Sequence, residues 1–228
     1  EQLLFFAAEI TVSGTNGVKF ITIHDNHLIA AGVVGNLNTV FHSEVNDYDD
    51  FAAGGSFTLS DQVVGIKGFR EDLIIFCTNS IYKLQNINNS STITIVPITK
   101  NVGCMDGASI QEIAGDLVFL SPDGLRTIAG TTRIGDVELG SVSRAIQSII
   151  GTIASEIDEL FVTSAVLRSK SQYRLFYSKP SATTVSSNGI IGTITPNGFE
   201  WSETEGIQAH AFTSGLDKDG LEKTFHGD

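Results

Sequence analysis

Apolar residues in this chain gather in short runs separated by turns, and one arrangement recurs four times. A polar residue is followed by an apolar strand, a turn and a second strand, and each copy carries a leucine in its apolar strand. These leucines, Leu28, Leu73, Leu117 and Leu175, lie 45, 44 and 58 residues apart. Repeats of about 40–50 residues with several strands each are typical of β-propeller blades. The pattern therefore predicts an all-β fold of the β-propeller class.

Each copy contains more than two expected strands. Further apolar segments precede the copies at residues 19–23, 63–67, 109–113 and 164–167, and a fourth segment follows two of them at 92–96 and 200–202. Four consecutive strands joined by turns form a meander. The second strand of each meander is continuously apolar, as expected of a strand buried between neighbouring blades. The fourth alternates between polar and apolar residues, as expected of an exposed edge.

The two ends of the chain each show half of the pattern. Residues 3–6 and 9–12 have the pattern of the last two strands of a blade, and residues 210–213 and 221–226 that of the first two. We predict one propeller domain over residues 1–228 whose incomplete first and last blades form one shared blade, because this closure removes exposed sheet edges. The total is then about five four-stranded blades. The alternative is that the halves continue in further sequence, as part of a larger propeller or a longer chain; the lack of an initial Met favours a processed or partial chain.

One segment departs from the strand pattern. Val142, Ala145, Ile146, Ile149 and Ile150 recur at helical spacing, which predicts a short inserted helix at residues 141–150. Ser141 or Ser143 is expected to cap its start, and Gly151 to end it. Its apolar stripe is expected to pack across the propeller, with a contact to another subunit as the alternative.

The charge balance narrows the possible partners. The chain has 14 Lys and Arg against 26 Asp and Glu, a formal net charge of −12. A nucleic-acid-binding surface needs clusters of basic residues, so sequence-specific DNA or RNA binding is not expected. The charge can serve solubility, or form an acidic wall that repels a nearby polyanion. The sequence contains no run of eighteen apolar residues, so a membrane helix is not predicted. No signal peptide is recognised.

Sequence motifs for chemistry are missing. Cys77 lies in an apolar strand and is expected in the core; neither it nor Cys104 belongs to a C-x-x-C pair, so no disulfide or zinc site is predicted. The sequence has no H-E-x-x-H, G-x-S-x-G, Walker A or G-x-G-x-x-G motif. His24 and His27 straddle a turn, and the aromatic residues are scattered among the repeats. We therefore predict no catalytic, cofactor-binding or metal-binding residue, no cofactor, and a protein that is not an enzyme.

Two acidic segments are candidates for cation sites. Residues 44–51 hold Glu44, Asp47, Asp49 and Asp50, but lack the glycine turn and the distal glutamate of an EF-hand. A turn with a helix-capping aspartate is the favoured interpretation there. Residues 217–220, Asp-Lys-Asp-Gly, predict a turn between two strands.

Several of these segments together resemble a known family. The resemblance rests on Phe41-His42-Ser43 leading into the acidic turn that ends at Phe51, on Asp72-Leu73-Ile74-Ile75-Phe76 followed by Ser80-Ile81-Tyr82, and on residues 117–125. This pattern of strands and turns resembles the propeller region of tail nozzle, or tail tubular, proteins of short-tailed bacteriophages. The similarity covers residues 18–150 well and the remainder loosely. The chain is much shorter than a full nozzle protein, which carries further domains that form the channel.

The resemblance implies a structural role in the virion. Nozzle proteins of this family form six-fold rings at the distal end of the DNA channel, below the portal and adaptor, and fibres attach around them. It implies a homo-oligomer in contact with adaptor and fibre proteins, with DNA passing without sequence recognition and no insertion into a membrane. We therefore expect a scaffold of a phage tail. The alternatives are a carbohydrate- or receptor-binding propeller module and, less favoured, a propeller glycan hydrolase or lyase.

Overall fold

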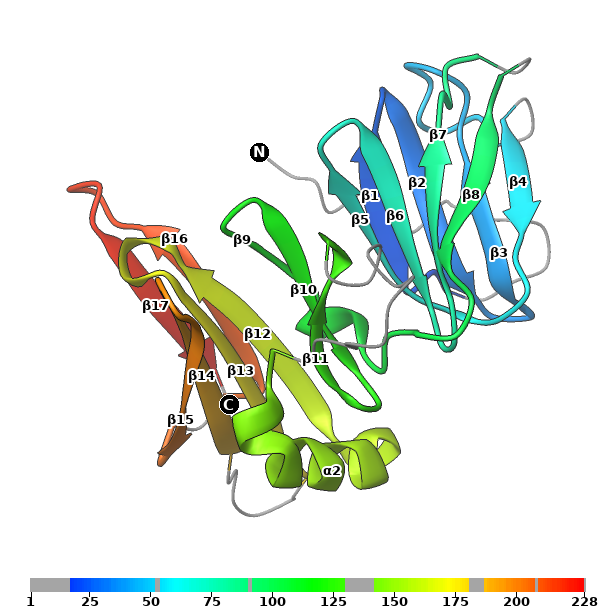
Figure 1. Ribbon diagram of the computed structural model, residues 1–228. Coiled ribbons are helices and arrows are strands. Elements are labelled where there is room, and N and C mark those ends of the chain that lie inside the picture. The colour runs from blue at the N-terminus through cyan, green and yellow to red at the C-terminus, as the bar shows by residue number, and fades with distance from the viewer. Residues whose placement is uncertain are drawn as a thin grey trace. The chain divides into compact units, whose positions relative to one another are not determined.

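The computed structural model describes residues 17–51, 54–89, 92–129, 142–180, 187–207 and 209–227. These residues form antiparallel sheets whose strands follow one another in chain order (Figure 1). The chain divides into two compact units, Glu1–Cys104 and Met105–Asp228.

The described residues of the first unit form two four-stranded meanders. The first sheet comprises β1 (Phe20–His24), β2 (His27–Val33), β3 (Asn36–His42) and β4 (Gly55–Thr58); the second comprises β5 (Val63–Phe69), β6 (Asp72–Cys77), β7 (Ile81–Gln85) and β8 (Thr94–Thr99). All seven residues of β2 are buried, as are five of the six in β6. Ile29 and Val40 of the first sheet pack in one cluster with Leu73 and Ile75 of the second. Each such fully buried aliphatic side chain stabilises the fold by roughly 1.5–3 kcal/mol.

The second unit contains a three-stranded, a four-stranded and a two-stranded sheet within its described residues. They comprise β9 (Gln111–Ile113), β10 (Asp116–Ser121) and β11 (Gly124–Thr127); β12 (Phe161–Leu167), β13 (Gln172–Ser178), β14 (Ser187–Thr195) and β15 (Gly198–Glu205); and β16 (Ala211–Leu216) and β17 (Glu222–Gly227). Short 3-10 turns lie at Gly107–Ser109, Arg144–Ile146, Ile157–Glu159 and Arg168–Lys170, and the helix α2 spans Gln147–Glu156.

The predicted fold class is confirmed: the protein is all-β, is built from β-propeller blades, and carries the short helix α2. Five sheets stand where about five blades were predicted, and three of them have four strands among the described residues. The strands predicted at residues 3–6 and 9–12 lie outside the described residues. The blade shared between the two ends therefore stays a prediction, as does the single-domain organisation.

The edge strands follow the expected pattern, with one addition. In β15, Phe199 and Trp201 are half-buried while Glu200 and Ser202 are exposed, and β8 carries Pro97, which an edge strand tolerates. The first blade also has a fourth strand, β4, that the sequence did not reveal. Its four residues Gly-Ser-Phe-Thr pair with the end of β3, where His42 lies opposite Gly55.

Hairpin registers correct the fourth repeat. In the second and third copies, the last residue pairs before the turn of the first hairpin are Phe69↔Asp72 and Ile113↔Asp116. The residue after each Asp is the buried leucine of the repeat, Leu73 or Leu117. In the fourth copy the closing pair is Leu167↔Gln172, so that the equivalent residue is Tyr173. Leu175, the residue that the repeat pattern aligned with Leu73 and Leu117, is buried too, but it lies two residues further along the strand. The Tyr173 hydroxyl donates a hydrogen bond of 2.9 Å to the carbonyl of Ser109.

The helix exists but its limits differ from the prediction. It runs from Gln147 to Glu156, past Gly151, which lies inside it with open space where a Cβ would stand. Ser143 makes no capping hydrogen bond, and Ser141 lies outside the described residues. Ile146, Ile150 and Ile153 are buried in the core of their own unit, whereas Ala145 is exposed. The apolar stripe is thus covered within the unit. Among the described residues, no helix has the length and hydropathy that crossing a membrane requires.

Buried serines complete the hydrogen bonding of strands where a neighbouring strand does not. Ser43 Oγ accepts from the Leu28 amide at 3.0 Å, Ser109 Oγ from Leu120 at 3.0 Å, and Ser143 Oγ from Leu125 at 2.8 Å. Ser187 Oγ likewise accepts from Ala209 at 3.0 Å. Because an unpaired amide in the core is costly, these hydroxyls act as substitutes for a backbone carbonyl.

Candidate functional site

The first blade places two imidazole rings side by side. His27 begins β2 directly after a two-residue turn in which Asp25 and Asn26 have positive φ angles of 47° and 61°, a conformation that Asp and Asn tolerate well. His42 ends β3. The two rings meet edge to face, with centroids 5.5 Å apart. The turn and the sheet pairing therefore bring together two histidines that are 15 residues apart in sequence.

One backbone carbonyl holds both rings. The carbonyl of Ser43 lies 2.6 Å from His27 Nδ1 and 3.1 Å from His42 Nδ1. A carbonyl can only accept, so each ring carries a proton on Nδ1. In neutral His42 the other nitrogen, Nε2, therefore presents a lone pair.

The surroundings keep His42 neutral. Burial lowers the pKa of His42, and nearby His27 lowers it further. The Ser43 carbonyl and the carboxylate of Glu44 act in the opposite direction without cancelling this effect. Near pH 7 His42 Nε2 is therefore a hydrogen-bond acceptor.

Two glycines and a phenylalanine fix the His42 ring. A Cβ on Gly55 would lie 2.6 Å from His42 Nε2, and one on Gly54 would lie 2.0 Å from the His42 carbonyl oxygen. The close approach of β4 to β3 therefore requires glycine at both positions. The ring of Phe57 stacks on His42 with centroids 5.4 Å apart and planes 21° apart.

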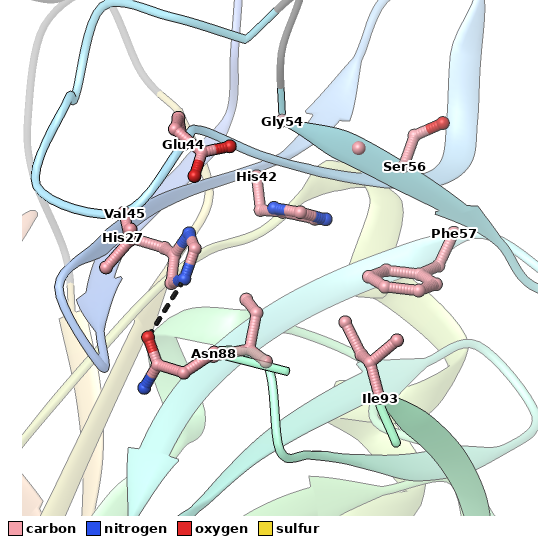
Figure 2. Close-up of a pocket in the computed structure, with 11 residues that line it drawn as sticks. His27, His42, Glu44, Val45, Gly54, Ser56, Phe57, Asn88 and Ile93 are labelled. Carbon is pink, nitrogen blue, oxygen red and sulfur yellow. Dashed lines mark hydrogen bonds between the residues drawn. The ribbon is translucent and has the colours of Figure 1, made fainter. Parts of the chain in front are cut away.

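A loop of the second blade closes the site. Asn88, in the loop between β7 and β8, lies with its Oδ1 3.2 Å from His27 Nε2, and because an amide oxygen can only accept, the imidazole donates this bond. Figure 2 shows this contact beneath the two imidazole rings. It links the first two blades within the first unit.

These residues surround a pocket of about 430 Å³. Its lining comprises His27, His42, Glu44, Val45, Gly54, Gly55, Ser56, Phe57, Ile87, Asn88 and Ile93. Within the described part of the chain, the Glu44 carboxylate, His42 Nε2 and the Asn88 amide nitrogen have no hydrogen-bond partner. The pocket thus offers acceptors and a donor beside an apolar wall, and the sequence did not predict it.

The acidic segment at residues 44–51 forms turns and no helix. Glu44 and Asp47 make an isolated β-bridge, and the Glu44 amide donates to the Asp50 carbonyl at 2.8 Å. The predicted helix-capping aspartate is therefore wrong, because no helix follows for it to cap. Of the four carboxylates, Glu44 lines the pocket. In the described ranges, no cluster of three or more His, Cys, Asp or Glu is arranged to hold a metal ion.

Other predicted features are found in place. Cys77 lies fully buried in its strand as expected, Cys104 is fully buried too, and burial raises the pKa of the Cys77 thiol to about 12. The turn at residues 217–220 is confirmed: Asp217 Oδ1 accepts from the amides of Asp219 and Leu221, each at 2.9 Å.

The scattered aromatic residues serve the packing of blades. The Trp201 indole donates to the Val142 carbonyl at 2.7 Å, and the Tyr82 hydroxyl lies 2.7 Å from Ser60 Oγ. Tyr173 joins β13 to the 3-10 turn Gly107–Ser109 through the Ser109 carbonyl. These three side chains therefore make contacts within the folded units. The aromatic residue at the pocket is Phe57, which sequence reasoning did not single out.

Comparison with known proteins yields structural likenesses only. No known protein family profile matches the chain, and no curated protein sequence does either. PorZ, a surface component of the type-IX secretion system of Porphyromonas gingivalis, aligns over 92% of this chain and 26% of its own with 11% identity and a TM-score of 0.44. BBS1N, from a complex with ARL6DN, aligns over 93% of this chain and 75% of its own with 12% identity and a TM-score of 0.43. Hsv2p of Kluyveromyces lactis aligns over 84% of this chain and 61% of its own with 10% identity and a TM-score of 0.39. This chain therefore spans about a quarter of PorZ.

Proposed function

We propose that this chain is a structural, non-catalytic β-propeller module of a bacteriophage tail, in which it forms part of a homo-oligomeric nozzle around the DNA exit channel. Adaptor and fibre proteins are its partners, and the virion tail is its location. DNA passes it without sequence recognition. The tail role rests on the resemblance in sequence, and the structural character rests on the following observation.

The polar residues of the motifs that resemble those of nozzle proteins form hydrogen bonds inside the blades. Ser43 Oγ accepts from Leu28 and donates to the Glu44 carbonyl at 2.9 Å. Asp61 accepts from Ser80 Oγ at 2.5 Å and from the Asn79 amide at 2.6 Å. Groups committed to such hydrogen bonds are the parts of a framework, which supports a scaffold over an enzyme.

Two physical features suit a tail scaffold. Each blade presents its edge strand and loops as separate surfaces, and a symmetric ring multiplies every weak contact between copies. The net charge of −12 disfavours binding to the phosphates of passing DNA, so the genome would not stall on the protein.

Mass photometry of the purified chain, with incorporation into tail particles that lack it, tests the proposal. A ring of about six copies of the 24.4 kDa chain, or its recovery in tail particles by electron microscopy, supports the nozzle role. A monomer at every concentration that is also absent from tail particles overturns it. The triple variant Asp47→Asn, Asp49→Asn, Asp50→Asn should fold and assemble as the unchanged chain does, since a scaffold needs no metal there.

A carbohydrate-binding role is the second candidate. It requires aromatic and carboxylate side chains to converge in one pocket, and Phe57 and Glu44 meet this condition at the pocket in the first unit.

A further inference from the structure

We propose that the pocket beside His42 binds a neutral pyranose ring of a glycan. The proposal does not depend on the tail role, and either can fail alone. It rests on the size of the pocket, on the free polar groups that face it, on its apolar wall and on the rigidity of its parts.

The volume fits a sugar. At about 430 Å³ the pocket is within the range of small-molecule sites, roughly 300–1,000 Å³. It is open to solvent on one side, so that a terminal sugar can enter while the rest of a glycan stays outside.

The free polar groups match hydroxyl groups. The Glu44 carboxylate and His42 Nε2 can each accept a hydrogen bond, and the Asn88 amide nitrogen can donate. A sugar hydroxyl does both, so one ring can satisfy all three groups. A purely apolar ligand would leave them unpaired, at a cost of about 1–3 kcal/mol for each group that becomes buried. An anion would meet the negative charge of Glu44.

One wall of the pocket is apolar. Phe57, Ile87 and Ile93 are among its lining residues. Figure 2 shows the His42 ring between Glu44 and Phe57, with Asn88 and Ile93 across the pocket. The C–H face of a pyranose can lie on such a wall while its hydroxyls reach the polar groups, which is the usual division of labour in a ligand site.

Two of the three binding groups, His42 Nε2 and the Asn88 amide, are held in place before a ligand arrives. The Ser43 carbonyl, the Phe57 stack and the glycine at position 55 fix His42, and the contact with His27 fixes Asn88. Fixed groups lose little conformational entropy on binding, which favours affinity. A lysine or arginine side chain of a partner could also use Glu44, but it would leave the Asn88 donor without an acceptor.

The test is NMR titration of the ¹⁵N-labelled chain with glucose, galactose, N-acetylglucosamine and rhamnose. We expect at least one sugar to shift the Glu44, Phe57 and Asn88 signals in a saturable manner, with a Kd of about 1 mM. The variant Glu44→Gln should weaken binding by about tenfold, which corresponds to about 1.4 kcal/mol. The variant Gly55→Ala should weaken it as well, because the new Cβ displaces the His42 ring into the pocket.

Asp49→Asn is the matched control. It removes the same charge from an exposed carboxylate that does not line the pocket, and it should leave the Kd unchanged. Absence of shifts with all four sugars overturns the proposal, and so does sugar binding that survives both pocket variants. If N-acetyl-lysine amide shifts these signals and the sugars do not, the pocket is a cation site and the proposal is wrong.

Discussion

Replacing Ser43 with Ala should lower the free energy of unfolding by about 2 kcal/mol. The Ser43 side chain is fully buried, and its Oγ accepts the Leu28 amide at 3.0 Å. Ala fits the same space, so neither a cavity nor a clash contributes. The Leu28 amide then has no acceptor, and leaving a buried donor unpaired costs about 1–3 kcal/mol. The Glu44 carbonyl loses one donor but keeps the Asp47 amide at 3.3 Å, so it adds little.

Urea unfolding measures the effect. For a slope m of about 1–3 kcal/mol per molar urea, a loss of about 2 kcal/mol moves the midpoint by roughly 1 M at unchanged m. Ser148→Ala is the control, because Ser148 is exposed on α2 and Ala is the better helix former. It should change stability by no more than about 0.5 kcal/mol. If the two variants unfold at the same urea concentration, the idea that buried serines replace backbone carbonyls is refuted.

Three further predictions address the helix, the fourth repeat and pH. Gly151→Ala should stabilise the protein by about 0.5–1 kcal/mol, because the site is helical and open; a lower melting temperature would contradict this. Tyr173→Phe should cost about 1–3 kcal/mol in urea unfolding, because the buried Ser109 carbonyl loses its hydroxyl donor. The folded state lowers the pKa of His42, so the unfolded chain binds a proton first and stability should fall as the pH drops below 6.5. His42→Gln should lose less stability than the unchanged chain between about pH 7 and pH 5, and equal losses would count against this assignment.

Local pattern accounts for most of the fold. Strands such as β2 and β6 are continuously apolar and buried, so their hydropathy alone predicts them. The strand β4 was missed because its four residues begin with glycine and bury only one face. Leu175 was wrongly aligned with the leucines of the other copies because the hairpin before Gln172 contains a 3-10 turn at Arg168–Lys170 that those copies lack. The helix passes Gly151 because nothing there requires a left-handed residue or a close approach.

The pocket could not be predicted from local pattern. His42 meets Phe57 only through the pairing of β3 with the unpredicted β4, and Asn88 arrives from a loop of the second blade. His27 was noted for its turn, but the Ser43 carbonyl that orients it becomes visible only in three dimensions. The nearest signal in the sequence was the pair of glycines at positions 54 and 55, whose close approach to His42 explains them in retrospect.

The buried thiols make the protein convenient for site-directed labelling. Cys77 and Cys104 have no exposed surface, and the pKa of Cys77 is about 12, so little reactive thiolate forms at neutral pH. A fluorophore or spin label carried by a maleimide should therefore react at a single cysteine introduced on an edge strand, without removal of the native pair. Distances between labels on different blades could then be measured in the intact chain.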